Sequence, residues 1–460
     1  AAFAQFPGSW LANSRRWNRW GEGRYPSMTD RRLPAILVSV LLASAFPGAD
    51  ERVGPLYGLE YRPIAPAGGG RVSGGAGIPG DPTTFWAATA AGGVWKSVNG
   101  GSAWESVFDD QPISSIGSIA IAPSDPSVVY VGSGEANIRG NVAEGNGIYR
   151  TTDAGENWAH VWNAEGQIGT VIVHPRDPDV AYAAVLGSPF GPGEERGVYR
   201  TIDGGRSWVR VLYVDENTGA SDVCCDPTNP RVLFAGTWPT RRSPWNLTSG
   251  GEGGGVWRSR DGGDSWTRLG PDHGLPGGIV GKVGVQVAPS NAKRVYALVE
   301  ADDGGLFRSD DGGESWDRIS ASRGVRQRAW YYSTLTVDPR DPDTVWFPQV
   351  SMLKTIDGGK TISPVKAAGW DYHDVWIDPV DPRRVVVGSD AGVSLSRDGG
   401  ATWERPPIPI SQFSHVSVDT RTPYRVLGSV QDLGTVSGPS RSLHGGGILL
   451  SDWHPVGGGE

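Results

Sequence analysis

Two carboxylates of this chain, Glu135 and Asp432, stand in variable polar segments where they could work together as an acid and a base. Hydrolysis of a glycosidic bond uses such a pair, with the two carboxyl groups roughly 5–10 Å apart. Glu135 belongs to the second, and Asp432 to the eighth, of a series of sequence repeats. A closed ring of repeats would make them near neighbours. We therefore take them as the candidate catalytic residues.

Further polar and aromatic side chains occur in the same class of variable segments. Aromatic rings combined with arginines and carboxylates suit a polysaccharide or peptide held in a groove. For each side chain alone, a solvated loop position is the alternative; together they favour a binding surface. The candidate ligand-binding residues are Asn137, Arg139, Glu195, Arg196, Arg241, Arg242, Trp330, Tyr331, Tyr332, His373, Gln412, His415 and Gln431.

Charge and cysteine content argue against several other functions. The formal net charge of −8 does not provide a basic surface, so no nucleic-acid partner is expected. No Cys and His cluster has the spacing of zinc ligands, and no calcium-binding loop motif is present, so we expect no metal and no cofactor. The adjacent Cys224 and Cys225 are expected to be buried thiols in a strand, with a vicinal disulfide as the alternative.

A motif of the form Ser/Thr-x-Asp-x-Gly-x-x-Trp occurs seven times, about every 50 residues, counting two imperfect copies. Its acidic side chain can accept backbone N–H bonds across a turn, and its tryptophan can bury a large apolar area. Seven near-identical copies indicate a structural role rather than a catalytic one. The residues at the acidic position are Asn99, Asp153, Asp203, Asp261, Asp311, Asp357 and Asp398.

Between these motifs lies a turn residue with proline, followed by a β-branched or aromatic run. Each repeat therefore predicts four short strands, which in the second repeat are Ile116–Ala122, Val128–Gly132, Gly147–Thr151 and Trp158–Trp162. Four-stranded units repeated at this spacing are typical of β-propeller blades. We predict an all-β propeller of four-stranded antiparallel blades over residues 57–460, with seven clear blades and an eighth partial one.

The turns of such a propeller fall on two faces. One face holds the repeated turn motifs, which connect the first strand of a blade to the second and the third to the fourth. The other face, here called the variable face, holds the remaining connections and all the candidate site residues. Two arrangements stay open: a closed eight-bladed ring, with residues 58–66 adding a strand to the last blade, or a larger ring completed by blades encoded downstream.

The N-terminal segment predicts export from the cytoplasm. Met28 is followed by two arginines, a ten-residue apolar run and a small-residue cleavage signal, in the order of a secretory signal peptide. We expect a signal peptide at residues 28–45, with residues 1–27 as non-native upstream or disordered sequence. The protein would then be secreted or periplasmic, with no membrane span after cleavage.

The repeated motif resembles the Asp box of secreted bacterial BNR-repeat proteins, a glycosyl-hydrolase-like family with a sortilin-type β-propeller. The resemblance runs from about Tyr61 to Gly459 and is strongest at residues 67–73, 89–97, 132–139, 330–333 and 412–419. It implies an extracytoplasmic propeller that binds a polysaccharide or peptide on its variable face. Further propeller blades encoded downstream would be its natural partners.

Two groups of enzymes share the Asp box. Sialidases need an arginine triad, which cannot be assigned in this chain. Two-propeller xyloglucan-cleaving glycosidases carry a catalytic Asp in a Thr-Asp-x-Gly-Gly stretch, and the similar stretch Thr89–Gly93 has Ala90 at that position. The resemblance therefore favours ligand binding, with glycoside hydrolysis of a polysaccharide as the alternative.

Overall fold

The structure is a computed structural model that describes residues 62, 64, 69–445 and 447–458. The predicted signal peptide at residues 28–45 and the segment before it lie outside the described residues, as does most of the predicted extra strand at residues 58–66. Within the described part of the chain, no helix combines the length and the apolar character needed to cross a membrane.

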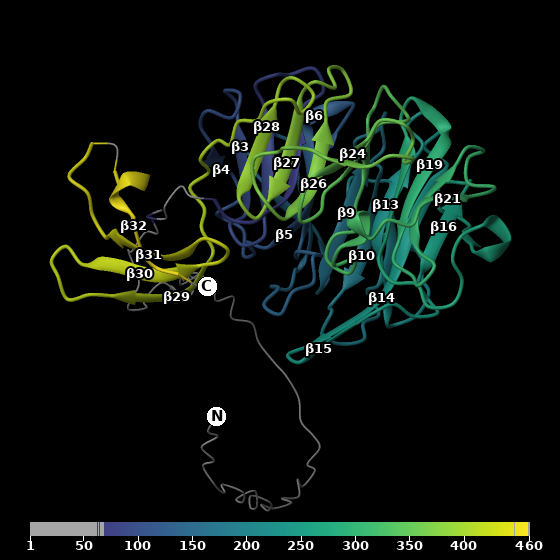
Figure 1. Cartoon of the computed structure of the whole chain (residues 1–460). Helices are drawn as coiled ribbons and strands as arrows, with labels where there is room; N and C mark the ends of the chain where they lie inside the picture. Colours follow the sequence, from purple (N-terminus) through teal and green to yellow (C-terminus); the bar gives the residue numbers. More distant parts are fainter. Residues whose placement is uncertain (1–61, 63, 65–68, 446, 459–460) are drawn as a thin grey trace, which may run out of the picture. The chain divides into compact units, whose positions relative to one another are not determined.

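The described chain is built of eight antiparallel sheets (Figure 1), each made from consecutive strands and numbered here in chain order. Sheet 1 consists of β1 (Val72–Gly77), β2 (Phe85–Thr89), β3 (Val94–Ser97) and β4 (Glu105–Ser106), and sheet 2 of β5 (Ile116–Ala122), β6 (Asp125–Ser133), β7 (Gly147–Thr151) and β8 (Ala159–Asn163). Sheet 3 consists of β9 (Gln167–Val173), β10 (Ala181–Gly187), β11 (Gly197–Thr201) and β12 (Val209–Leu212). Sheet 4 consists of β13 (Thr218–Cys225), β14 (Leu233–Ser243), β15 (Asn246–Ser249), β16 (Gly255–Ser259) and β17 (Thr267–Leu269).

Sheets 5 to 8 follow the same plan, with one short sheet. Sheet 5 consists of β18 (Val283–Ala288), β19 (Asn291–Val299), β20 (Gly305–Ser309) and β21 (Asp317–Ser320), and sheet 6 of β22 (Thr336–Val337), β23 (Val345–Phe347), β24 (Leu353–Thr355) and β25 (Ser363–Pro364). Sheet 7, the short one, consists of β26 (Tyr372–Ile377), β27 (Val385–Ser389) and β28 (Gly392–Ser396). Sheet 8 consists of β29 (Phe413–Val418), β30 (Arg425–Val430), β31 (Gly434–Pro439) and β32 (His454–Gly457). Three short 3-10 helices are η1 (Pro271–His273), η2 (Arg323–Arg326) and η3 (Leu450–Asp452).

The all-β propeller prediction is confirmed, and the strand limits in the second repeat are close to those expected. β5 and β7 have the predicted ends, whereas β6 begins three residues early, at Asp125, and β8 begins one residue late. Cys224 and Cys225 lie side by side in β13 and are free thiols. Burial raises the pKa of the Cys225 thiol to about 11.

The repeated acidic motif forms a hydrogen-bonded turn between the third and fourth strands of a sheet. In sheet 2, Asp153 Oδ1 accepts from Thr151 Oγ1 (2.6 Å) and from the amide of Asn157 (2.9 Å). The Thr151 hydroxyl oxygen accepts from the amide of Gly155 (3.0 Å), whose φ of +94° suits glycine. The same contacts recur at Asn99, Asp203, Asp261, Asp311, Asp357 and Asp398.

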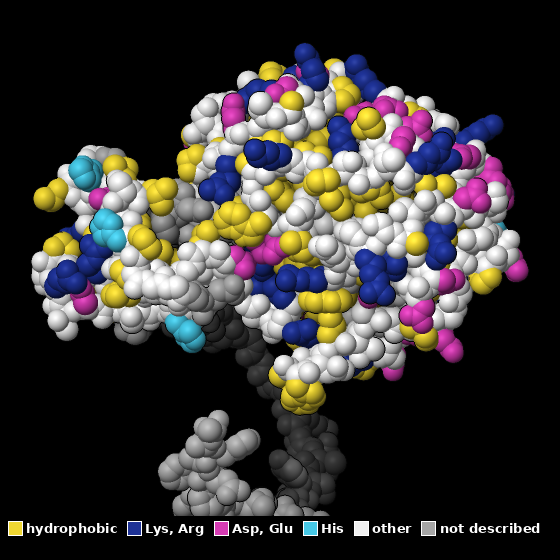
Figure 2. Space-filling view, in the orientation of Figure 1, with side chains coloured by type: hydrophobic (Ala, Val, Ile, Leu, Met, Phe, Trp, Pro, Cys, Tyr) yellow, Lys and Arg dark blue, Asp and Glu magenta, His cyan; other side chains and the backbone are white. Residues whose placement is uncertain are grey.

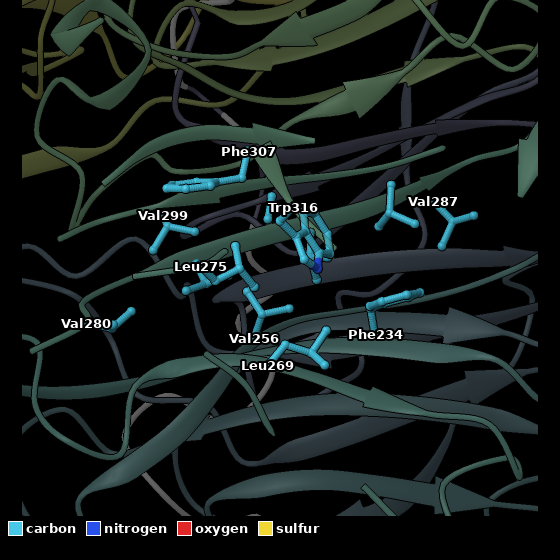
Figure 3. Packing of buried hydrophobic residues seen from close by; sticks show 13 residues of the cluster. Phe234, Val256, Leu269, Leu275, Val280, Val287, Val299, Phe307 and Trp316 are labelled. Atoms are coloured by element: carbon cyan, nitrogen blue, oxygen red, sulfur yellow. The ribbon is translucent and has the colours of Figure 1, made fainter. Parts of the chain in front are cut away.

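Hydrophobic cores fill the space between neighbouring sheets. Between sheets 4 and 5, the tryptophan of an acidic-motif turn, Trp316, is 4% exposed and lies 6.4 Å from the ring of Phe234 at an angle of 81°. Val256, Leu269 and Leu275 complete the cluster around it (Figure 3). The turn motif therefore joins two sheets as well as two strands.

Side-chain hydrogen bonds connect the innermost strands of seven sheets into a closed ring. At each junction, one side chain or amide of an inner strand bonds to the inner strand of the next sheet; we call this set the inter-sheet belt. Its bonds are Ser73 Oγ to Ile116 O (2.5 Å), Val171 N to Ser118 Oγ (2.9 Å), Thr170 Oγ1 to Asp222 Oδ1 (3.0 Å), Val285 N to Asp222 Oδ2 (2.9 Å), Val337 N to Gln286 Oε1 (2.6 Å), Thr336 Oγ1 to Val375 O (2.9 Å) and Gly75 N to Asp374 Oδ2 (3.1 Å).

The ring closes between sheet 1 and sheet 7, where β1 packs against β26 and β27. Both alternatives above, an eight-bladed closed ring and a larger ring, are therefore wrong: sheets 1 to 7 close the ring by themselves, and in the described part of the chain sheet 8 takes no part in the belt. Closure of the ring by seven sheets requires neighbouring sheets to approach each other closely near the ring axis. At Gly284, an added Cβ would lie 2.3 Å from the carbonyl oxygen of Ser333, which only glycine avoids.

The belt contains a buried carboxylate whose ionisation should affect stability. Burial raises the pKa of Asp222 to about 6, although three hydrogen-bond donors partly oppose this. Because the folded pKa exceeds the unfolded value of 3.8, the folded state holds the proton more tightly. The contribution of this proton on Asp222 to the free energy of unfolding is therefore present below about pH 4 and is lost as the pH rises through about 6.

We expect the free energy of unfolding of the wild type to fall, relative to Asp222→Asn, by about 2 kcal/mol between pH 4 and pH 7. Urea unfolding of both proteins at pH 4, 5, 6 and 7 measures this difference, since other titrating groups cancel between them. A difference that does not change with pH would contradict the assignment.

Candidate functional site

A buried ion pair stands at the variable-face end of the ring. Arg71 immediately precedes β1, and Asp390 immediately follows β27 in sheet 7. The Arg71 guanidinium donates to both carboxylate oxygens of Asp390, from Nε (2.5 Å) and Nη2 (2.6 Å). Burial alone would raise the pKa of Asp390, but hydrogen bonds from His373 and Arg71 hold it well below its usual range. Asp390 is therefore a carboxylate at neutral pH.

His373, in β26, is held in one tautomer by its neighbours. Its Nε2 lies 2.6 Å from Asp390 Oδ1, and because a carboxylate can only accept, Nε2 carries the proton. Its Nδ1 then accepts from the side-chain amide of Asn137, 2.9 Å away. Lys282 Nζ lies 3.5 Å from Asn137 Oδ1, which orients that amide so that its NH₂ faces the histidine.

Glu135 is the second carboxylate of this cluster and is fully buried. Its Oε2 accepts two bonds from Arg139, at 2.6 and 3.0 Å. Its Oε1 lies 3.7 Å from Arg71 Nε. Asp432 Oδ2 lies 3.3 Å from Arg71 Nη2. Arg71 is thus surrounded by three carboxylates, two of which are the predicted catalytic residues.

The segment between β6 and β7 reaches across the ring axis. Asn137, from sheet 2, contacts His373 of sheet 7 and Lys282 at the start of sheet 5. Ile138 is fully buried against Leu186 of sheet 3 and Trp238 of sheet 4. We call residues 134–146 the crossing loop. It covers the charged cluster and brings the first candidate residues, in sheet 2, to the opposite side of the ring.

Lys282 lies beneath the crossing loop and is almost fully buried. Its Nζ donates to the carbonyl oxygen of Tyr331 (3.0 Å) and lies 5.4 Å from the centre of the Trp238 ring. Burial lowers the pKa of Lys282 to about 8, although the charges of Glu300, Asp222 and Glu135 oppose the shift. Lys282 therefore remains mostly cationic at neutral pH.

Three aromatic side chains from the segment between η2 and β22 complete the site. Tyr331 and Tyr332 are buried, and Tyr332 donates to Asp371 Oδ1 (2.7 Å). The Tyr332 ring stacks on His373 at 6.1 Å and 16°. Trp330 is partly exposed and packs against the crossing-loop cluster. We define the axial site by the members Arg71, Glu135, Asn137, Arg139, Lys282, Trp330, Tyr331, Tyr332, His373, Asp390 and Asp432.

Several buried polar atoms near the inner ends of these loops have no hydrogen-bond partner among the described residues. Arg71 Nη1 and Glu135 Oε1 belong to the axial site itself. Gln349, which follows β23 and is 1% exposed, has neither amide atom bonded. Leaving such atoms unpaired costs about 1–3 kcal/mol each, so water or a ligand is expected to satisfy them.

The remaining predicted ligand-binding residues do not join the axial site. Arg196 is fully buried and donates to the carbonyl oxygens of Leu186 and Ser188, so its charge is used within its own loop. Glu195 is exposed. Gln412, His415 and Gln431 belong to sheet 8: Gln412 and Gln431 are bonded to each other through their backbones (2.9 Å), and His415 is exposed in β29.

Arg241 and Arg242 lie in a strand, not in a loop as expected, because β14 extends into a hairpin with β15. This hairpin projects from the ring (Figure 1), and hydrophobic side chains cover its tip (Figure 2). Trp245, in the turn of the hairpin, is 86% exposed. The hairpin enlarges the variable face without contributing to the buried charge cluster.

Sequence reasoning missed Arg71, Lys282 and Asp390. Arg71 and Lys282 directly precede inner strands, and Asp390 directly follows a second strand, which are the positions that face the axis. The available signal was the alignment of repeats, since Ser389-Asp390-Ala391-Gly392 in sheet 7 corresponds to Thr89-Ala90-Ala91-Gly92 in sheet 1. Sheet 7 therefore has a carboxylate where sheet 1 has Ala90.

Neither family models nor curated protein sequences match this chain. Among solved structures, the chain is similar to the GH74 xyloglucanase of Xanthomonas campestris, with a TM-score of 0.59 and 18% identity over 82% of this chain and 60% of that one. The GH74 enzyme of Niastella koreensis is similar at a TM-score of 0.55 and 17% identity, over 81% and 60%. YCF48 bound to D1 peptide matches at a TM-score of 0.46 and 16% identity, over 74% and 97%.

The likeness to the two GH74 proteins shows a β-propeller fold. At 17–18% identity it concerns the fold alone, and the chain spans about 60% of the length of these two proteins. The likeness to YCF48 is too distant to bear on function.

Proposed function

We propose that this protein is an extracytoplasmic β-propeller that binds a polysaccharide on its variable face without cleaving it. One observation carries the proposal: the carboxylates of the axial site are held by arginines. Asp390 is bonded to Arg71, Glu135 to Arg139, and Asp432 lies 3.3 Å from Arg71. The extracytoplasmic location rests on the signal peptide expected at residues 28–45.

A glycosidase requires a carboxylic acid that stays protonated until it meets the glycosidic oxygen. The Asp390 carboxyl has its pKa held well below the usual range. Glu135 is fully buried, and its Oε2 is occupied by Arg139. Neither group is therefore arranged as a proton donor, which favours binding over the alternative, hydrolysis.

The exposed part of the axial site suits a sugar chain. Trp330 offers a partly exposed aromatic surface, and the Arg139 guanidinium and Asn137 amide, although bonded to Glu135 and His373, each keep further N–H groups for a ligand. The buried residues beneath hold these groups in place. Because the fold is that of a GH74 xyloglucanase, xyloglucan is the first polysaccharide to test. A peptide ligand is the competing interpretation.

We expect Trp330→Ala to weaken xyloglucan binding about 10- to 30-fold, because truncating a central aromatic residue typically costs 1–2 kcal/mol or more. Affinity electrophoresis in gels containing xyloglucan measures the change. Tyr424→Ala is the matched control, since Tyr424 is 47% exposed in the turn between β29 and β30, at the opposite end of β30 from Asp432. An equal loss in both variants would contradict the site.

Reducing-sugar release from the same polysaccharide distinguishes binding from hydrolysis. We expect retention in the gel with no release. Release that disappears in Glu135→Gln and Asp432→Asn would establish the glycoside hydrolase alternative. Failure to bind any polysaccharide in a panel, together with binding of a peptide library, would overturn the polysaccharide proposal.

A further inference from the structure

A cavity of about 420 Å³ lies beside sheet 5, apart from the axial site. It is formed where the turn between β19 and β20 meets η2, the short helix that leads from sheet 5 to sheet 6. The size is within the range of small-molecule binding sites. Its lining residues are Ala301, Asp302, Arg323, Arg326 and Gln327.

Both walls of the cavity are anchored to the core. Val325, in the middle of η2, is fully buried in the cluster between sheets 5 and 6. Ser322 caps η2 by accepting from the amide of Gly324 (3.1 Å). On the other wall, the amide of Gly304 donates to the carbonyl oxygen of Ala301 (3.0 Å), which closes the turn. The two arginines of η2 therefore stand on a fixed support.

Among the described residues, no ion pair neutralises the positive charge on the helix side of the cavity. Arg326 Nη1 donates to the carbonyl oxygen of Ala301 (3.0 Å), and its buried Nε has no partner among the described residues. Burial and the like charges of Arg323 and Arg318 lower the pKa of Arg326. The nearby carboxylate of Glu300 is already bonded to Ser249 Oγ and to the amide of Lys282, both at 2.7 Å.

The side of the cavity formed by the β19–β20 turn has a different chemistry. Asp302 in this turn presents a carboxylate, which can only accept hydrogen bonds, and Gln327, at the end of η2 beside the arginines, presents an amide that can accept or donate. A simple inorganic anion would gain from the arginines but would be repelled by Asp302. The lining instead suits a ligand with a carboxylate at one end and hydroxyl donors at the other.

We propose that this cavity is a subsite for a uronic acid residue of an acidic polysaccharide. Arg323 and Arg326 bind the sugar carboxylate, and Asp302 and Gln327 accept hydrogen bonds from the ring hydroxyls. The subsite rests on the proposed function in one respect, namely that the ligand is a polysaccharide. It adds a second class of ligand, a sugar that carries a carboxylate, to the neutral polysaccharide tested at the axial site.

Isothermal titration calorimetry of the full chain with trigalacturonate tests the subsite. We expect measurable binding that weakens at high salt, with cellotriose, a neutral trisaccharide, binding at least tenfold more weakly. Arg323→Ala should reduce trigalacturonate affinity at least tenfold. Arg206→Ala, at an exposed position of an acidic-motif turn on the opposite face, should not change it. Equal binding of the neutral trisaccharide would overturn the proposal.

Asp302→Asn separates a uronic acid subsite from a simple anion site. Loss of the hydroxyl acceptor should weaken trigalacturonate binding several-fold, although the variant removes a negative charge. Tighter binding of both trigalacturonate and sulfate by Asp302→Asn would mean that only charge matters, and would overturn the proposal. Thermal unfolding of each variant confirms that the fold is intact.

Failure here is distinguishable from failure of the proposed function. Trp330→Ala should weaken xyloglucan binding but leave trigalacturonate affinity unchanged. Arg323→Ala should weaken trigalacturonate binding but leave xyloglucan binding unchanged. Xyloglucan binding without any trigalacturonate binding would reject the subsite and retain the axial site.

Discussion

Replacing Asp390 with alanine is expected to lower the free energy of unfolding by about 3–5 kcal/mol, because it leaves a buried charge without its partner. Among the described carboxylates, Arg71 would keep Asp432 at 3.3 Å and Glu135 at 3.7 Å. His373 would lose the acceptor of its Nε2 proton. Denaturant unfolding followed by tryptophan fluorescence measures the loss.

The pH dependence of this contribution has a definite sign. Since the folded pKa of Asp390 is depressed, its stabilisation is present at neutral pH and is lost as the pH falls through the folded pKa. The difference between wild type and Asp390→Ala should therefore shrink in acid. A constant difference would show that packing, rather than charge, explains the loss.

Asp264→Ala is the control for this prediction. Asp264 accepts from Arg200 at 2.8 Å but is mostly exposed, so we expect a change of about 0–1 kcal/mol. The double variant Arg71→Met, Asp390→Leu should be less destabilised than either single replacement, because it removes both buried charges. A loss below about 1 kcal/mol in Asp390→Ala would contradict the importance of the buried pair.

Replacing Trp316 with alanine is expected to cost about 3–5 kcal/mol, as for other large-to-small replacements in a core. Trp316 is 4% exposed and fills the space among Phe234, Val256 and Leu269 between sheets 4 and 5 (Figure 3). The cavity left behind would loosen one junction of the ring. The same unfolding experiment measures the effect.

Trp245→Ala is the matched control, because Trp245 is 86% exposed at the tip of the β14–β15 hairpin. A surface replacement of this kind usually changes stability by less than about 0.5 kcal/mol. Similar losses in Trp316→Ala and Trp245→Ala would show that the tryptophan of the acidic motif is not a core residue.

The strands could be predicted because their signals are local. In the second repeat, β5 and β7 begin and end where turn residues and β-branched runs place them. The early start of β6 at Asp125 comes from pairing with Ala122 across a tight turn, which composition does not reveal. The number of blades in the ring was not predictable in this way, since closure depends on contacts between Asp374 and Gly75, far apart in the sequence.

The axial site could be predicted only in part. Glu135, Asn137 and Tyr331 were recognisable as unusual polar and aromatic residues between repeats. Arg71 and Asp390 were not, because each adjoins a strand and resembles an ordinary strand end. What joins them is the crossing of residues 134–146 over the ring axis, a tertiary arrangement with no local signal.

The closure of the ring also has a consequence for synthesis. The belt bond between Gly75 and Asp374 joins residues 299 positions apart. At a translation rate of about 5–20 residues per second, about 15–60 s pass between the synthesis of sheet 1 and the synthesis of sheet 7. During that interval the face of β1 that later packs against β26 and β27 has no partner sheet. The junction between sheets 1 and 7 therefore cannot form until most of the chain has been synthesised, and the unpartnered face of β1 can mispair during that time.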